Sequence, residues 1–144
     1  MAPVAYDPEN VFLKIIKGEI PSFKLFETEH VLAILDAFPA VPGHALLLPK
    51  APGFATVMDM TPEVAANVFK ELPRLAKAVQ EATGADGIGI MQNNGLAADQ
   101  TVFHAHIHVV PRFTGDGLIQ LPASQGMITK EDAAAMQAKI QTKL

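Results

Sequence analysis

The stretch FHAHIHVVPR, residues 103–112, carries the pattern on which the interpretation of this sequence depends. Its histidines His104, His106 and His108 occur at every second position, with apolar residues between them. A period of two is typical of a β-strand, where alternate side chains point to opposite faces of the sheet. The pattern predicts a strand from Val102 to Val110, with three imidazoles on one face and an apolar row packed into the core.

Further apolar runs bounded by turn residues predict four more strands. Their expected bounds are Lys24–Glu27, Val31–Leu35, His44–Pro49 and Gly87–Gln92. A fourth histidine, His44, opens one of these runs directly after a glycine. The polar loop NNGLAADQ, residues 93–100, separates the last run from the strand that carries the three histidines.

Two helices are predicted near the ends of the chain. The first spans residues 10–17, where Asn10 is a candidate N-cap and Gly18 a stop signal. The second begins at about Thr129 and runs towards Gln141.

The strongest helix signal covers residues 61–83. Thr61 is a capping residue, Pro62 occupies the first helical position and Gly84 ends the pattern. Pro73 lies inside the apolar stripe, so we expect it to kink the helix or break its hydrogen-bond ladder.

Length and composition favour one compact domain over residues 1–144. The chain has 144 residues, of which 49% are hydrophobic and 18% charged, which is typical of a globular protein. Antiparallel strands with a few helices to one side indicate the α+β class.

Composition also excludes several kinds of site. Without cysteine there are neither disulfides nor thiolate metal sites. A net charge of −4 without a basic cluster argues against nucleic-acid binding. The opening MAPVAYDPEN has no signal-peptide pattern, and no apolar run is long enough to cross a bilayer. We expect a soluble protein without a membrane partner.

The histidine row has two chemical interpretations. Neighbouring histidines can share zinc or copper, but no acidic residue or cysteine lies within the segment to complete such a site. In the second interpretation the imidazoles act on phosphorus. Same-face neighbours on a strand lie roughly 6.6 Å apart, and two charged imidazoles at that distance would repel by about 2.5 kcal/mol at an effective dielectric constant of ~20. Most of the histidines should therefore be neutral at pH 7, so that one can attack while its neighbours stabilise phosphate charge.

The sequence resembles the histidine triad (HIT) family. HAHIHVV matches the family signature His-φ-His-φ-His-φ-φ, where φ is apolar. FLKIIKGEIPS, ILDAFPAVPGHALLLPK and QNNGLAADQTVFHAHIHVVPR resemble family segments in the same order, over most of residues 10–112. The resemblance is to the nucleotide-binding branch, and it implies a HIT-like antiparallel sheet of about five strands with a long and a short helix. Residues 113–144 would form a C-terminal extension.

The resemblance also implies roles for individual residues. His106 matches the nucleophile that forms a nucleotidyl-histidine intermediate, and His108 matches the residue that contacts the α-phosphate. His104 and His44 match the pair that orients the nucleophile. The implied substrate-binding residues are the ribose-binding Asp36, the polar Asn93 and Thr101 near the phosphate, and an apolar base slot made of Val11, Phe12, Ile15, Ile34 and Ala37. From the residues alone, Asp36 would be taken for a turn residue and those five for core.

Three departures from the family pattern matter. Asn10 and Leu13 stand where many relatives have a zinc-binding cysteine pair. Asp99 replaces the usual glycine of the phosphate loop, so it belongs to the expected substrate-binding set, and its backbone must adopt the conformation that glycine supplied. The C-terminal segment is longer than in close relatives. No cofactor or metal is implied.

The resemblance implies a cytoplasmic homodimer, with the nucleus as an alternative location, in which an edge strand and the helix at 61–83 of each subunit pair to continue the sheet. Its ligand would be a purine nucleotide, AMP or an adenosine phosphoramidate. The first function hypothesis is hydrolysis of nucleoside 5′-phosphoramidates or aminoacyl adenylates to AMP. The alternatives are hydrolysis of dinucleoside polyphosphates (Ap3A or Ap4A), and regulatory nucleotide binding without catalysis.

Overall fold

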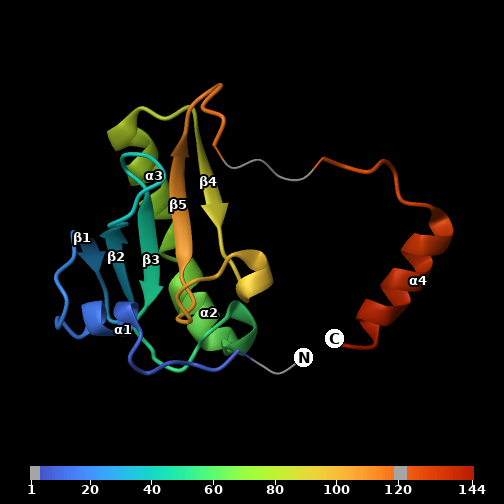
Figure 1. Ribbon diagram of the computed structural model, residues 1–144, viewed down its shortest axis with the longest axis horizontal. Helices are drawn as coiled ribbons and strands as arrows, with labels where there is room; N and C mark the ends of the chain where they lie inside the picture. The colour runs from blue at the N-terminus through green and yellow to red at the C-terminus, as the bar shows by residue number, and fades with distance from the viewer. Residues whose placement is uncertain (1–3, 119–122) are drawn as a thin grey trace.

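A computed structural model describes residues 4–118 and 123–144. Its centre is an antiparallel sheet with the order β1-β2-β3-β5-β4 (Figure 1). The strands are β1 (Lys24–Glu27), β2 (Val31–Leu35), β3 (Ala45–Pro49), β4 (Gly87–Met91) and β5 (Ile107–Arg112). The predicted α+β class and five-stranded sheet are confirmed, and β4 forms one edge of that sheet. Dimerisation through an edge strand stays a prediction.

The predicted break in the long helix is confirmed. The segment forms α2 (Pro62–Phe69) and α3 (Leu72–Thr83), with Pro73 in the first turn of α3. Thr61 caps α2 through its side chain, which accepts a hydrogen bond from the backbone N–H of Val64. In the first turn of a helix, the missing N–H of proline costs no helical hydrogen bond. Pro73 therefore lies at the start of α3 instead of kinking one long helix.

The other helices also agree with the sequence. α1 (Val11–Ile16) is capped by Asn10, whose Oδ1 accepts from the backbone N–H of Leu13. α4 (Lys130–Gln141) is capped by Thr129, has no buried residue and lies apart from the sheet in Figure 1. The short 3-10 helices η1 (Val57–Asp59) and η2 (Leu96–Ala98) were not predicted. No helix in the described part of the chain is long and apolar enough to cross a membrane.

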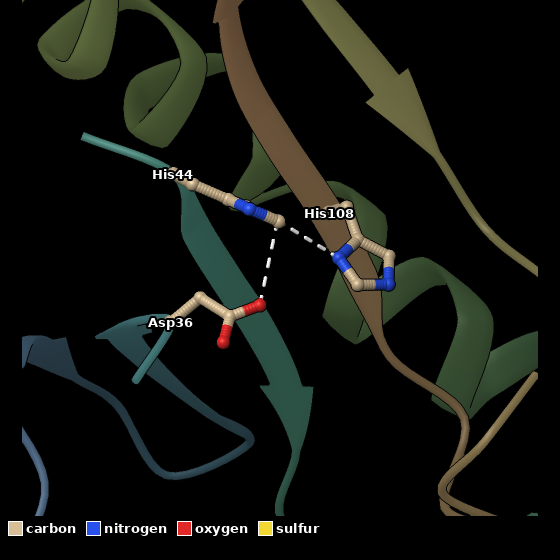
Figure 2. Close-up of side chains that lie close together, drawn as sticks. All are labelled: Asp36, His44 and His108. Atoms are coloured by element: carbon tan, nitrogen blue, oxygen red, sulfur yellow. Dashed lines mark hydrogen bonds and ion pairs between the residues drawn. The ribbon is translucent and has the colours of Figure 1, made fainter. Parts of the chain in front are cut away.

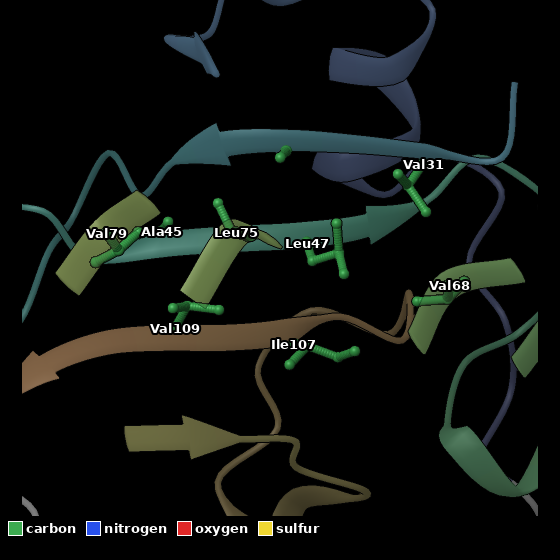
Figure 3. Packing of buried hydrophobic residues seen from close by; sticks show 9 residues of the cluster. Val31, Ala45, Leu47, Val68, Leu75, Val79, Ile107 and Val109 are labelled. Atoms are coloured by element: carbon green, nitrogen blue, oxygen red, sulfur yellow. The ribbon is translucent and has the colours of Figure 1, made fainter. Parts of the chain in front are cut away.

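Each face of the sheet has its own apolar layer. On one face α2 and α3 pack over a cluster that includes Leu47, Leu75 and Ile107 (Figure 3). On the other face α1 contributes Phe12, which packs with Leu46 and Leu48 of β3. Because side chains alternate along a strand, β3 supplies both layers.

The strand predicted from Val102 to Val110 is wrong in its first half. β5 begins only at Ile107, and residues 101–106 form an irregular segment. The expected alternation holds from there on, since Ile107 and Val109 pack under the helices and His108 faces the opposite side, next to Leu46. His104 and His106 therefore precede the strand.

We predict that Leu47→Ala lowers the free energy of unfolding by about 3 kcal/mol, because it leaves a cavity at the centre of the core. Leu47 is fully buried, whereas Leu25 on β1 is 44% exposed. Leu25→Ala is the matched control and should cost less than about 1 kcal/mol. Urea denaturation measures both values, and equal losses would contradict this account of the core.

Candidate active site

A pocket of about 500 Å³ opens on the face of the sheet that α1 covers. The predicted residues that line it are Val11, Phe12, Ile15, Ile34, Asp36, Ala37, Thr101, His106 and His108. The pocket thus brings together the expected apolar slot, the expected ribose carboxylate and two histidines. Asn93 and Asp99 are not among its lining residues, and His44 and His104 are buried next to it.

Phe12 and Ile34 belong both to the core and to the pocket. They are only 9% and 2% exposed, while Val11 at the mouth is 39% exposed. Phe12 also meets His106 edge to face, with ring centroids 4.7 Å apart. The two interpretations of these side chains, core or base slot, are therefore compatible.

The proton on His106 is placed by a backbone carbonyl. Nδ1 of His106 lies 2.7 Å from the carbonyl oxygen of His104. A carbonyl can only accept, so Nδ1 carries the hydrogen and Nε2 keeps its lone pair. His104 is the expected partner of His106, but its backbone carbonyl makes the contact and its imidazole does not.

The proton on His108 is set through His44. The backbone N–H of Ala40 donates to Nδ1 of His44, at 3.1 Å. Nε2 of neutral His44 must then carry the hydrogen, which it donates to Nδ1 of His108 at 2.9 Å (Figure 2). His108 is left with an Nε2–H, a donor suited to a phosphate oxygen. The side chain of His44 is thus hydrogen-bonded to His108. The resemblance had implied that His44 would help to orient His106 directly.

Asp36 is held at the end of β2. Its backbone N–H donates to the carbonyl oxygen of His44, and its Oδ1 accepts from the backbone N–H of Phe38 at 2.8 Å. The second oxygen, Oδ2, lies 3.6 Å from Nε2 of His44 (Figure 2). Asp36 is therefore both the turn residue that its sequence context indicates and a carboxylate at the pocket.

Burial keeps the histidines neutral. Desolvation is the main cause that lowers the pKa of His44, His104 and His106 below the usual 6.5. Desolvation, followed by the charges that His106 and His44 would carry, lowers the pKa of His108 to about 4. Neutrality was predicted from repulsion between imidazoles, but the larger cause is burial.

The cluster Asp36, His44 and His108 is close enough to be considered as a metal site. Its hydrogen bonds oppose this use. A metal would need the lone pair of Nε2 of His44, which requires moving the hydrogen to Nδ1, against the N–H of Ala40. The N-terminal zinc site of some relatives does not fit either, because the Asn10 side chain caps α1 and Leu13 is buried.

Two contributions to the site were missed from the sequence. Gln100, 1% exposed, holds the loop before the histidines: its side chain accepts from the N–H of Gly95 and donates to the carbonyls of Ala55 and Val102. Phe38, 92% exposed, lines the pocket mouth. Gln100 has no local sequence signal. For Phe38 the one hint in the sequence is its position two residues after Asp36.

Comparison with known proteins identifies one family. The HIT domain model matches residues 17–115. An Arabidopsis thaliana adenylylsulfatase is 43% identical over 108 residues, which are 75% of this chain and 54% of that protein, so the chain spans about half its length. An adenosine 5′-monophosphoramidase of Saccharomyces cerevisiae is 43% identical over 111 residues, 77% of this chain and 67% of that protein. The crystal structure of a HIT family protein from Bacillus anthracis superposes with a TM-score of 0.88 at 35% identity, covering 98% of this chain and 99% of that one.

We predict that acid destabilises the fold through these histidines. Their pKa values are lower in the folded chain than in the unfolded one, so below about pH 6.5 the unfolded state binds more protons. The free energy of unfolding should therefore fall as the pH drops from 6.5 towards 4, with each histidine contributing up to ~1.4 kcal/mol per pH unit. Urea denaturation at several pH values measures the slope. It should be smaller in His108→Gln, and an unchanged slope would contradict the assignment to His108.

Asp99 gives a second prediction. Its φ of 61° lies in the left-handed region, as expected where relatives have glycine. A β-carbon in that region costs about 1 kcal/mol, which aspartate tolerates better than alanine. Asp99→Ala should therefore be about 1 kcal/mol less stable than Asp99→Gly in thermal denaturation. Equal stabilities would mean that the loop relaxes.

Proposed function

Because the chain belongs to the HIT family, we propose that it is a nucleotide hydrolase that cleaves nucleoside 5′-phosphoramidates to AMP. The observation that carries the proposal is the complementary protonation of two histidines in one pocket. His106 offers a lone pair on Nε2, and His108 offers a hydrogen on Nε2. Their ring centroids are 4.9 Å apart, close enough to act on one phosphoryl group.

The proposed reaction has two steps. Nε2 of His106 attacks the α-phosphorus, and a new P–N bond forms while the bond to the leaving amine breaks. The electron pair stays on the amine nitrogen, which takes up a proton from solvent. Water then attacks the phosphorus and gives up a proton to solvent, the electron pair of the P–N bond returns to Nε2 of His106, and AMP leaves with the neutral histidine restored.

Neighbouring groups would stabilise the intermediate. The modified His106 ring is an imidazolium whose Nδ1–H still donates to the His104 carbonyl. The negative charge of Asp36 raises the pKa of His106, against the larger effect of burial, and would favour the imidazolium for the same reason. His108 would donate its Nε2–H to a phosphoryl oxygen, where charge develops.

The pocket lining favours an amine leaving group over a polyphosphate. The described lining residues include the carboxylate of Asp36 but neither lysine nor arginine. Attack on diadenosine tetraphosphate would release a nucleoside triphosphate, whose several negative charges such a pocket does not neutralise. The names of the yeast and plant relatives, a phosphoramidase and an adenylylsulfatase, also support small leaving groups on AMP. An apolar base slot selects weakly among purines.

We expect the purified chain to release AMP from adenosine 5′-phosphoramidate at least about tenfold faster than from diadenosine tetraphosphate. His106→Ala should lose at least about 10³-fold in kcat, because no other group can form the covalent intermediate. His30→Ala is the matched control, since His30 lies on the turn between β1 and β2, away from the pocket, and should keep full activity.

The other results would select another function. Preference for the tetraphosphate would assign a dinucleoside polyphosphate hydrolase with the same nucleophile. Tight binding of AMP by an inert wild type would favour the non-catalytic hypothesis.

A further inference from the structure

Tyr6 is the chain's only tyrosine, and it lies in the segment before α1, outside the residues that line the pocket. Its hydroxyl oxygen lies 2.9 Å from Nδ1 of His104, and the two ring centroids are 5.8 Å apart. His104 itself is 1% exposed. This part-buried contact between residues 98 positions apart in sequence links the N-terminal segment to the histidine cluster.

The direction of this hydrogen bond follows from the other ring nitrogen. Nε2 of His104 lies 2.7 Å from the carbonyl oxygen of Pro49, which can only accept. Nε2 therefore carries the hydrogen, and Nδ1 of the neutral ring has a lone pair. The Tyr6 hydroxyl must donate to it. Both ring nitrogens are then satisfied, and the ring is fixed between β3 and the N-terminal segment.

Fixing His104 fixes the nucleophile. The carbonyl that orients His106 belongs to the backbone of His104, in the segment that has no strand partners. The N–H of Ala105 belongs to the same planar peptide unit as this carbonyl, and it donates to the carbonyl of Phe54 at 2.8 Å. The imidazole of His104 supplies two further anchors, to Tyr6 and to Pro49. Without them, one hydrogen bond alone would set the direction of the His104 carbonyl.

We infer that Tyr6 is a positioning residue for the nucleophile His106, acting through the imidazole and then the backbone carbonyl of His104. The inference rests on the proposed function for its kinetic readout. It also ties catalysis to the order of the N-terminal segment, because α1, which follows Tyr6, supplies the Phe12 ring that packs against His106.

Tyr6→Phe tests the inference because it removes only the hydroxyl and keeps the ring. Loss of one well-placed hydrogen bond should lower kcat for AMP release by about tenfold, with KM changed less than twofold, since Tyr6 does not line the pocket.

Two comparisons separate positioning from stability. Asp7→Ala removes a side-chain hydrogen bond to the backbone N–H of Glu9 in the same segment without touching His104, and should leave kcat unchanged. In a double-mutant cycle, Tyr6→Phe should add little to the loss in His104→Ala, because both break the same chain of contacts. A kcat for Tyr6→Phe within twofold of wild type, or full additivity with His104→Ala, would overturn the inference.

A spectroscopic readout keeps the inference testable if the wild type proves inert. Two-bond ¹H–¹⁵N NMR spectra of the full chain report which nitrogen of each histidine is protonated. The wild type should show His104 with its proton on Nε2 and His106 with its proton on Nδ1. In Tyr6→Phe both signals should change. Unchanged signals for His106 would overturn the inference whether or not the proposed function holds.

Discussion

Four imidazoles lie along β3, from His44 just before its first residue to His104 at the carbonyl of its last residue, Pro49. Each has a hydrogen bond that decides which ring nitrogen is protonated. The backbone supplies the fixed reference points: the N–H of Ala40 can only donate, and the carbonyls of Pro49 and His104 can only accept. From these three groups the protonation of the whole cluster follows. A strand-like backbone through the histidines would direct its carbonyls to neighbouring strands, so the irregular segment before β5 is what frees one of them to hold His106.

The same arrangement needs neutral rings. A proton added to His44 would place an N–H against the Ala40 N–H, which can only donate, and burial makes an extra charge on any of the four rings costly. The proposed reactivity at neutral pH and the predicted loss of stability in acid therefore have one physical cause, the burial of neutral rings. The negative charge of Asp36 opposes it in part, because it raises the pKa of His106 against the larger effect of burial.

Much of the fold could be predicted because its signals are local. Thr61 and Pro73 mark helix starts through capping and the missing proline N–H, and the strands follow from short apolar runs. The start of β5 could not be predicted in this way. HAHIHVV alternates throughout, but its pairing with β3 stops at Leu47 and Ile107, although β3 itself continues to Pro49, and the residues before Ile107 have no partner in register. Periodicity describes which side chains alternate, while the extent of a strand depends on where its backbone is paired.

The same distinction between local sequence signals and tertiary contacts applies to the candidate site. Residues of the histidine motif and of the apolar slot, together with Asp36 and Thr101, were found through the motif and the family resemblance, and nine of these residues meet in one pocket. Tyr6 and Gln100 were not found, because their contacts join segments that are distant in sequence and carry no local pattern. A tyrosine in a polar N-terminal segment has no apparent role until the fold places a histidine lone pair beside it. In this site most side chains expected to contact the ligand follow from motifs and family resemblance, whereas the contacts that hold them in place follow from tertiary structure alone.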